Sequence, residues 1–348
     1  MTMLAELVDL VIGVDTHKNS HSAAVIDAST GAVRTTITVG TDPDGLDELI
    51  AAADQLPGTR IWSIEGAGSY GAGLTRRLHE LGEQVIEIDR PGRPARRGGA
   101  KSDPIDAVRA AREALTRQHL AQPRASGERA ALAALMVARR SAVQATGDAE
   151  RQLHALITTA PEPLRNRFRD RTTAVIITTA CKLRAHPSWD LETRTYATVL
   201  RDLAHRCRAL QREADTQHRA ITAIVRSWRP DLLELPGVGP ISAATILCTW
   251  SHPGRCRHEA AFANLAGVAP IPASSGQTTR YRLNRHGDRD LNRALHIIVL
   301  TRLRIDPTTR AYAQRRQAEG KTPREIRRCL KRYLARQIYR QLEAPPTP

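Results

Sequence analysis

Four acidic residues, Asp15, Glu65, Asp103 and Asp106, stand in sequence settings that would bring their carboxylates to one site. Asp15 and Glu65 each end an apolar run, so each is expected at the C-terminal tip of a buried strand. Asp103 and Asp106 open a predicted helix, where i,i+3 spacing puts both on one face near the positive end of the helix dipole. Carboxylates this close repel one another unless hard cations neutralise them, so we expect them to bind Mg²⁺ or Mn²⁺ jointly, as in two-metal phosphoryl-transfer sites.

His17 and Lys18 follow directly after Asp15. Either side chain could assist proton transfer or hold a phosphate. We favour a simple polar turn after a strand as the explanation for this pair, and we leave both residues out of the predicted catalytic set.

The elements that must position these acids lie in the first hundred residues. Period-two apolar runs and helical patterns alternate there, which predicts a mixed sheet covered by helices and is typical of a ribonuclease H-like domain. We expect strands at 8–14, 21–27, 33–39, 61–65 and 84–88, and helices near 43–54 and 70–81. A basic Gly/Pro-rich segment at 90–99 leads to the Asp103 helix and either touches phosphate or forms a mobile loop.

Two long segments, 126–157 and 191–228, carry apolar residues at helical spacing. They predict an antiparallel helical pair or coiled-coil arm, with a core-forming helical bundle as the alternative.

Positive charge is concentrated near the end of the chain. The formal net charge is +16, and residues 280–340 contain 18 Lys/Arg against 5 Asp/Glu, a net of +13. This distribution indicates a polyanion-binding module rather than an ordinary solvated helical surface, which mixes signs more evenly. Because aromatic residues make up only 3% of the chain, contacts to a nucleic-acid backbone fit better than a dominant base-stacking platform.

The five cysteines are odd in number and scattered, with neither metal-type pairs nor a disulfide framework. We expect them to be reduced. The sequence shows neither a signal-peptide pattern nor an apolar run long enough to span a membrane, so we expect a cytoplasmic protein without a membrane partner.

Two motifs in the last third of the chain suit phosphate contact. The Leu235–Pro240 segment contains Gly237 and Gly239 at a predicted helix start, where free backbone N–H groups can bind phosphate, and it resembles the hairpin of helix-hairpin-helix modules. Farther on, a Gly-flanked turn contains Ser274 and Ser275 ahead of an arginine cluster that includes Arg280, Arg282 and Arg285. A serine there could attack a phosphodiester, or it could be an ordinary loop or capping serine.

Five segments together resemble the DEDD transposases of insertion sequences, the family that includes Piv-type DNA invertases and bridge-RNA-guided recombinases. They are VIGVDTHK at 11–18, the strand ending at Glu65, KSDPIDA at 101–107, LPGVGPISA at 235–243 and AGVAPIPASSG at 266–276. The resemblance implies an α/β plus α chain: a RuvC-like domain at 1–122, a helical coiled-coil connector at 123–230, and a mainly helical transposase domain at 231–348.

The resemblance also implies roles. Asp15, Glu65, Asp103 and Asp106 would bind the divalent metal, and the family's nucleophilic serine falls at Ser275 in preference to Ser274. DNA would be cut and rejoined through a covalent serine–phosphate intermediate. A noncoding guide RNA and a homo-oligomer, dimer or tetramer, are the implied partners, and the site of action is the bacterial nucleoid.

Three alternatives remain open. A RuvC-like junction nuclease would use the same acids to activate water, and a covalent protein–DNA adduct would separate it from the transposase. An ATP-binding actin-like or sugar-kinase domain would need a second Gly-rich phosphate loop at a suitable distance, and this sequence shows none. A non-catalytic nucleic-acid-binding protein has no reason to gather four carboxylates.

Overall fold

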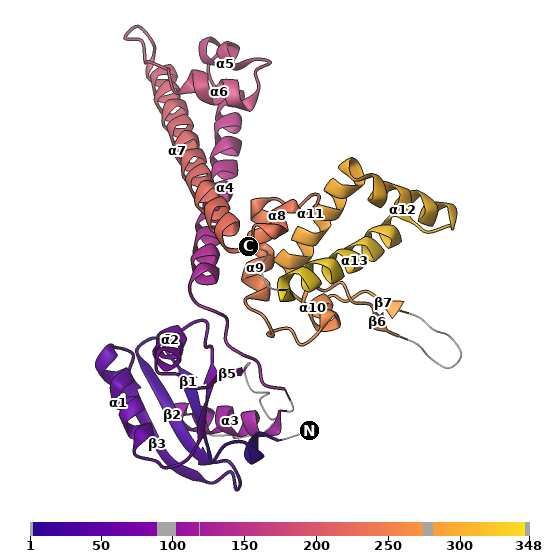
Figure 1. The fold of residues 1–348 in the computed structure, drawn as a ribbon. Coiled ribbons are helices and arrows are strands. Elements are labelled where there is room, and N and C mark those ends of the chain that lie inside the picture. The colour runs from indigo at the N-terminus through magenta and orange to yellow at the C-terminus, as the bar shows by residue number, and fades with distance from the viewer. Residues whose placement is uncertain (1–2, 89–101, 118, 274–280, 345–348) are drawn as a thin grey trace. The chain divides into compact units, whose positions relative to one another are not determined.

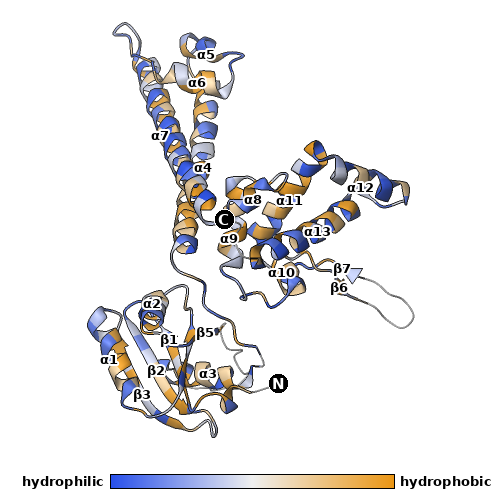
Figure 2. Cartoon of the chain, in the orientation of Figure 1, coloured by the Kyte–Doolittle hydropathy of each residue, from blue (hydrophilic) through white to orange (hydrophobic). Residues whose placement is uncertain are grey.

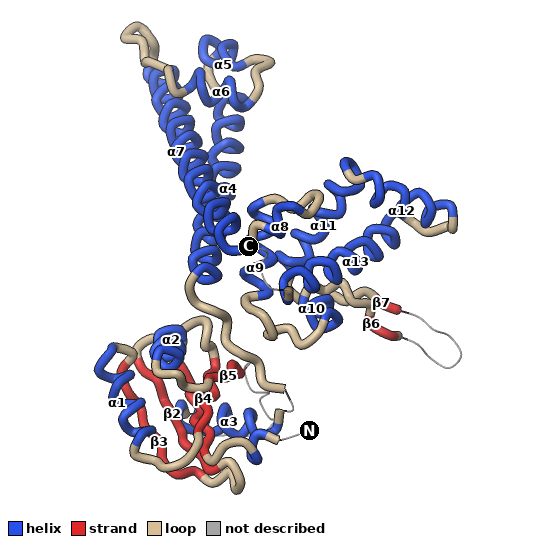
Figure 3. The backbone as a smooth tube through the Cα atoms, in the orientation of Figure 1, coloured by secondary structure: helices blue, strands red, loops and turns tan. Residues whose placement is uncertain are grey.

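A computed structural model describes residues 3–88, 102–117, 119–273 and 281–344. They form two compact units, Met1–Ser126 and Gly127–Pro348, which we describe separately (Figure 1). The first unit is a sheet with helices, and the second is almost entirely helical (Figure 3).

The N-terminal unit contains a five-stranded mixed sheet with the order β3-β2-β1-β4-β5. β1 pairs antiparallel with β2 and parallel with β4; β2–β3 is antiparallel and β4–β5 is parallel. The mixed α/β sheet predicted from the sequence is therefore confirmed. The strands are β1 (Leu10–Thr16), β2 (Ser20–Asp27), β3 (Val33–Gly40), β4 (Arg60–Glu65) and β5 (Val85–Ile88), preceded by a 3₁₀ turn, η1 (Leu4–Glu6).

Helices cover both faces of this sheet. The period-two pleat sends Ile12 and Val14 of β1 into a core with α1 (Pro43–Asp54) and α2 (Ala72–Glu80). Val11 points to the opposite face, where it packs with the alanines of α3 (Asp103–Thr116). Burial on both faces explains why β1 is apolar from Leu10 to Val14.

The first strand is displaced from its predicted position. It was expected at 8–14 and occupies Leu10–Thr16, so Asp15 lies within the strand rather than just after it. Two interactions account for the shift: the Asp9 carboxylate accepts hydrogen bonds from Thr59 before the strand begins, and antiparallel pairing continues to Thr16 opposite His21.

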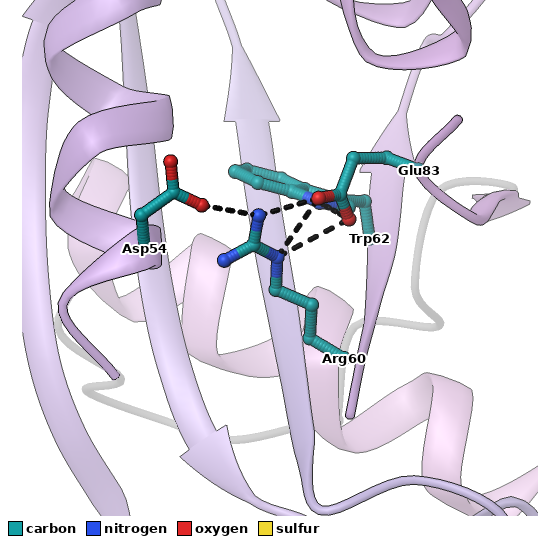
Figure 4. Close-up of polar contacts among 4 residues, drawn as sticks. All are labelled: Asp54, Arg60, Trp62 and Glu83. Atoms are coloured by element: carbon teal, nitrogen blue, oxygen red, sulfur yellow. Dashed lines mark hydrogen bonds and ion pairs between the residues drawn. The ribbon is translucent and has the colours of Figure 1, made fainter. Parts of the chain in front are cut away.

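A polar network fixes the end of β4 that lies away from Glu65 (Figure 4). Arg60 donates to Asp54 at the end of α1, with Nη2 2.6 Å from Oδ1, and to Glu83 ahead of β5, with Nε 3.1 Å from Oε1. Trp62 Nε1 donates to Glu83 Oε2 at 2.9 Å. These contacts hold the ends of α1, β4 and β5 together.

The C-terminal unit begins with two long antiparallel helices, α4 (Glu128–Thr159) and α7 (Leu191–Trp228), as predicted. Between them the chain forms two short helices, α5 (Glu162–Phe168) and α6 (Thr173–Ala180). These pack with the adjoining parts of α4 and α7 in a core that includes Leu153, Phe168, Ile176, Leu200 and Cys207.

The remaining helices form a second core around Trp250, Phe262 and Leu295. Ile221 of α7 and Leu132 of α4 belong to the same core, which therefore runs across residue 230, the predicted boundary between the connector and the transposase domain. The three-domain division stays a prediction. The elements are α8 (Asp231–Glu234), α9 (Pro240–Trp250), α10 (Glu259–Leu265), β6 (Ile271–Pro272), β7 (Tyr281–Arg282), α11 (Arg289–Ile305), α12 (Pro307–Ala318) and α13 (Pro323–Glu343).

Figure 2 colours α12 largely hydrophilic, in contrast to the apolar α9 of the core. Among the described residues, no helix combines the length and apolar character needed to cross a membrane.

Candidate functional site

The sheet register puts Asp15 and Glu65 at neighbouring positions. Val14 is paired with Ile64 on the parallel strands β1 and β4, and the two acids come next on each strand. Parallel strands lie about 4.8 Å apart, and residues at matching positions face the same side of a sheet. The two strands are further joined at this end because Thr16 Oγ1 donates to the backbone oxygen of Glu65 at 2.7 Å.

Helix α3 reaches this end of the sheet because the strands offer it small residues. A Cβ atom at Gly13 would lie 2.2 Å from Ala107 O and 2.4 Å from Ala111 N, so the helix backbone rests directly on β1. Ser63 lies beside Gly13 on the neighbouring strand β4, and its Oγ donates a hydrogen bond to Ala110 O at 2.9 Å. With Ala107 seated over Gly13, the first turn of α3 lies beside Asp15, two residues farther along the strand.

The structure brings Asp15 and Asp103 together through His17. His17 Nε2 lies 3.3 Å from Asp15 Oδ2 and 3.3 Å from Asp103 Oδ1. One ligand atom from each of these three residues lies within 4.8 Å of the others. Among the described residues, Glu65 and Asp106 do not belong to this tight group. Glu65 is nevertheless the last residue of β4, and Asp106 lies in the first turn of α3 together with Asp103.

His17 is the residue that sequence reasoning left out. It follows β1 in the turn closed by its own N–H donating to Ser20 O at 3.0 Å, as a polar turn would require. Its position two residues after Asp15, directly after the end of the same strand, is the signal that could have identified it.

The charge environment of Asp15 is that of a crowded acidic site. Burial is the main cause that raises the pKa of the Asp15 carboxyl above its ordinary value. His17 opposes this rise in pKa, whereas the carboxylates of Asp106 and Asp103 add to it. Asp106 also accepts a hydrogen bond from Arg109 Nη1 at 2.6 Å, so one of the four acids already has a cationic partner.

The donor set fits a hard divalent cation. Carboxylate oxygens are the ligands that Mg²⁺ and Mn²⁺ prefer, and an imidazole that hydrogen-bonds ligating carboxylates is a common outer partner in metal sites. Asp103 sits in the first turn of α3, at the end of the helix where the dipole favours a negative side chain.

Two models of transposase families match the chain. A family model for IS110-type DEDD transposases matches residues 12–160, which contain all four acids, and a model described as the Transposase IS116/IS110/IS902 family matches residues 230–314. The chain belongs to this transposase family. The resemblance drawn from the five sequence segments is thereby confirmed.

Two relatives of this transposase come from insertion elements. The insertion element IS900 uncharacterized 42 kDa protein of Mycobacterium paratuberculosis is 28% identical, over 89% of this chain and 89% of that protein. The insertion element IS110 uncharacterized 43.6 kDa protein of Streptomyces coelicolor is 32% identical, over 37% of this chain and 33% of that protein. The family depends on divalent metal, in agreement with the candidate acidic site.

The predicted nucleophile lies outside the described residues. Ser275, its neighbour Ser274, Arg280 and the basic segment at 90–99 all fall in undescribed stretches of the transposase. Arg282 lies in β7, and Arg285 follows it as an exposed side chain.

The two predicted glycine contacts occupy different environments. Gly237 has φ +78°, and a Cβ there would lie 3.0 Å from Ile298 O, so it packs against α11. Arg302 Nε donates to Pro236 O at 2.7 Å and holds the same turn. Gly239 precedes α9, and a Cβ there would meet no atom within 4 Å, so the space beside its Cα is open.

The base of the hairpin formed by β6 and β7 is firmly held. Gly267 and Gly287 both have positive φ and pack closely: a Cβ at Gly267 would lie 2.6 Å from His286 O, and one at Gly287 would lie 2.7 Å from Leu265 O. Asn292 Nδ2 donates to Ala266 O at 2.7 Å. These contacts hold the segments that lead into β6 and out of β7.

Proposed function

We propose that this chain cuts and rejoins the DNA of an insertion sequence through a covalent serine–phosphate intermediate. In this proposal the N-terminal unit is a RuvC-like domain whose four acids hold Mg²⁺ or Mn²⁺. The C-terminal unit supplies the nucleophile Ser275, with a helix-hairpin-helix-like turn at Gly237 and Gly239 contacting the DNA backbone.

The observation that carries the proposal is the convergence of Asp15 and Asp103 on His17 from elements far apart in the chain. Burial and two neighbouring carboxylates make the ionised form of Asp15 costly. A fold gains nothing from such crowding unless a cation compensates it, so the arrangement supports a metal-binding role.

The chain's residues would divide the reaction between them. A bound divalent ion would supply neutralisation of charge on the reacting phosphate and lower the barrier to deprotonating the nucleophile. Ser275 Oγ would form a bond to phosphorus as one phosphorus–oxygen bond of the DNA backbone breaks. In net terms the serine proton passes to the departing deoxyribose oxygen. Arg280, Arg282 and Arg285 would stabilise the developing charge, and rejoining would reverse the step without ATP.

The nucleic-acid partners in this proposal are donor DNA, target DNA and a noncoding guide RNA. The protein itself would act as a homo-oligomer, a dimer or a tetramer, in which the acids of one protomer work with the serine of another. The net charge of +13 over residues 280–340 supports contact with nucleic-acid phosphates. The nucleoid of the bacterial cytoplasm is the corresponding place of action.

The test compares single variants on a labelled DNA substrate. Asp15→Asn and Asp103→Asn are expected to abolish cleavage, whereas Glu113→Gln on the same helix α3, an acid paired with Arg117, should retain it. Ser275→Ala should bind DNA, RNA and metal yet form no adduct on a denaturing gel, and Ser274→Ala should remain at least partly active.

Two outcomes would redirect the assignment. An adduct that persists in Ser275→Ala and is missing in Ser274→Ala would move the nucleophile to Ser274. Cleavage without any adduct in the wild type would favour a nuclease that activates water with the same acids.

A further inference from the structure

A cavity in the C-terminal unit lies between the base of the β6–β7 hairpin and helix α13. Its volume is about 430 Å³, within the range of about 300–1,000 Å³ usual for ligand pockets. Five cationic side chains line it: Arg282, Arg328, Lys331, Arg332 and Arg336. Apolar atoms come from the Val268–Pro270 segment and from two tyrosines, Tyr281 and Tyr333.

The positive charge of this pocket is only partly compensated. Glu259 pairs with Arg332 and Arg336, each at 2.7 Å. Within the described ranges, Arg282, Arg328 and Lys331 have no carboxylate at ion-pair distance. Burial lowers the pKa of Lys331, and the neighbouring Arg328 and Arg289 lower it further. An anion bound among these cations would relieve their mutual repulsion and stabilise their charged forms.

Lys331 is held in place by a neutral group. Its Nζ donates to Asn292 Oδ1 at 3.0 Å, while Asn292 Nδ2 donates to the backbone oxygen of Ala266. The amide is therefore fixed by contacts on both sides, and it joins the lysine of α13 to the base of the hairpin. The cation faces the pocket in a fixed position without being neutralised.

Two aromatic rings stand exposed at the same pocket. The exposed fractions are 64% for Tyr281 and 53% for Tyr333. Aromatic residues are scarce in this chain, so two exposed rings beside unpaired cations indicate a ligand with both a flat apolar face and a phosphate. Nucleotides combine these properties, and any of the bases can stack on an aromatic side chain because each has a flat face.

We propose that this pocket holds one unstacked nucleotide of the DNA strand being cut, with its phosphate on Lys331, Arg328 and Arg282 and its base against Tyr281 and Tyr333. The proposal rests on the proposed function, because DNA is favoured as the occupant by the serine pair that lies between β6 and β7 in the sequence. Holding a nucleotide out of the stack would fix the DNA backbone at the base of the β6–β7 hairpin.

The test uses Cys329, which lines the pocket, as a reporter. The alkylation rate of Cys329 in the full chain is measured by mass spectrometry with a chelator present, so that no cleavage is required. Cys181, which lies at the end of α6, serves as the internal reference. We expect a short oligodeoxyuridylate to slow alkylation of Cys329 but not of Cys181.

Variants separate the phosphate contact from the base contact. Lys331→Gln and Tyr281→Ala should each raise the oligonucleotide concentration needed for protection about tenfold or more, whereas Tyr281→Phe, which keeps the ring, should not. Arg208→Gln removes one exposed charge from α7 and is the matched control for charge. Unchanged thermal unfolding temperatures would show that the variants are folded.

Three results would overturn the inference. An abasic oligomer of the same length could protect Cys329 as well as the oligodeoxyuridylate does, or Lys331→Gln and Arg208→Gln could weaken oligonucleotide binding equally. Stronger protection of Cys329 by oligouridylate than by oligodeoxyuridylate would assign the pocket to RNA. Because binding is measured without metal, these results are independent of cleavage. Loss of cleavage in Asp15→Asn together with failed protection would leave the proposed function standing and remove only the pocket.

Discussion

His17 shows how one side chain can complete a site that was anticipated from acids alone. Its Nε2 lies at equal distances of 3.3 Å from Asp15 and Asp103, so it links a strand to a helix. Partners that hydrogen-bond metal-ligating groups fix the orientation of those groups, and losing one typically weakens metal binding about ten- to hundredfold.

We therefore predict that His17→Ala lowers the affinity for Mn²⁺ about tenfold or more and slows DNA cleavage. Titration calorimetry on the full chain measures the first effect. Lys18→Ala, which changes the adjacent exposed residue of the same turn, is the control and should bind Mn²⁺ like the wild type. Unchanged metal affinity in His17→Ala would return His17 to the role of a turn residue.

At the scale of elements, the site depends on how closely α3 approaches β1. The added Cβ of Gly13→Ala would overlap the backbone of Ala107 and Ala111, so α3 must shift. Overpacking of this kind costs about 1–3 kcal/mol. Helix α3 carries Asp103 and Asp106, so its shift would displace both carboxylates. A displacement of about 1 Å at a reacting site lowers the rate about a hundredfold, and we therefore predict that cleavage falls by more than the loss of stability alone would cause.

Gly73→Ala is the matched control for this variant. Gly73 lies in helix α2, and a Cβ there would meet no atom within 4 Å. Alanine at such a helical position is expected to stabilise by about 0.5–1 kcal/mol. Urea unfolding and cleavage rates measured on both variants distinguish the two cases, and wild-type cleavage by Gly13→Ala would refute the positioning role.

The Arg60 network gives the first unit a pH dependence. Hydrogen bonding from Arg60 holds the pKa of Glu83 below its ordinary value, with burial opposing the effect. Because the folded-state pKa is the lower one, the unfolded chain takes up the proton first. The stabilisation is thus complete above the ordinary glutamate pKa of about 4.3 and is lost as pH falls through the folded-state value.

We predict that acid weakens protection of the β4 amides against hydrogen exchange, and that Glu83→Gln makes this protection less dependent on pH below about 4.3. Glu80→Gln removes an exposed carboxylate nearby and serves as the control. An identical pH profile in wild type and Glu83→Gln would show that the Arg60–Glu83 pair does not contribute.

The sequence predicted elements better than it predicted contacts between them. The five strands, α1, α3 and the two long helices were expected because period-two and helical patterns are local properties. By contrast, the shift of β1 depends on Asp9 meeting Thr59, and the fixed position of Lys331 depends on Asn292, 39 residues earlier. Such pairings arise from tertiary packing, which no local pattern encodes.

The candidate site was anticipated to a similar degree. The settings of Asp15 and Asp103 indicated convergence because strand ends and helix starts meet at one edge of such a sheet. The sequence could not show that Gly13 and Ser63 form the seat of α3, since a buried Gly and Ser read only as small residues within apolar strands.

On the scale of the whole molecule, the candidate metal site and the most basic stretch of the chain lie in different units. The candidate metal site lies entirely in Met1–Ser126, and the most basic stretch lies in Gly127–Pro348. Each unit has cores of its own, with Trp62 and Leu74 buried in the first and Trp250 and Phe262 buried in the second. A covalent serine mechanism needs groups from both units, whereas a water-activating nuclease needs only the first.

This segregation leads to a prediction for the two units produced as separate chains, 1–126 and 127–348. Division at residue 230 would be a poorer choice because Ile221 and Val225 of α7 share a core with α9. The second chain keeps the basic stretch 280–340, so it should bind DNA with nearly the salt dependence of the whole protein. Each phosphate that it neutralises contributes about −0.9 to the slope of log affinity against log salt concentration. The first should bind Mn²⁺, and neither should cleave DNA alone.

Salt titration of DNA binding and a cleavage assay on each chain check these expectations. Arg282→Gln in the second chain should lower the magnitude of the salt slope by about one phosphate contact. Cleavage by 1–126 alone that disappears in Asp15→Asn would overturn the shared mechanism, because the acids would then act on water without any serine. Absence of cleavage in both chains, with metal binding retained in the first and DNA binding in the second, is what a reaction divided between the two units requires.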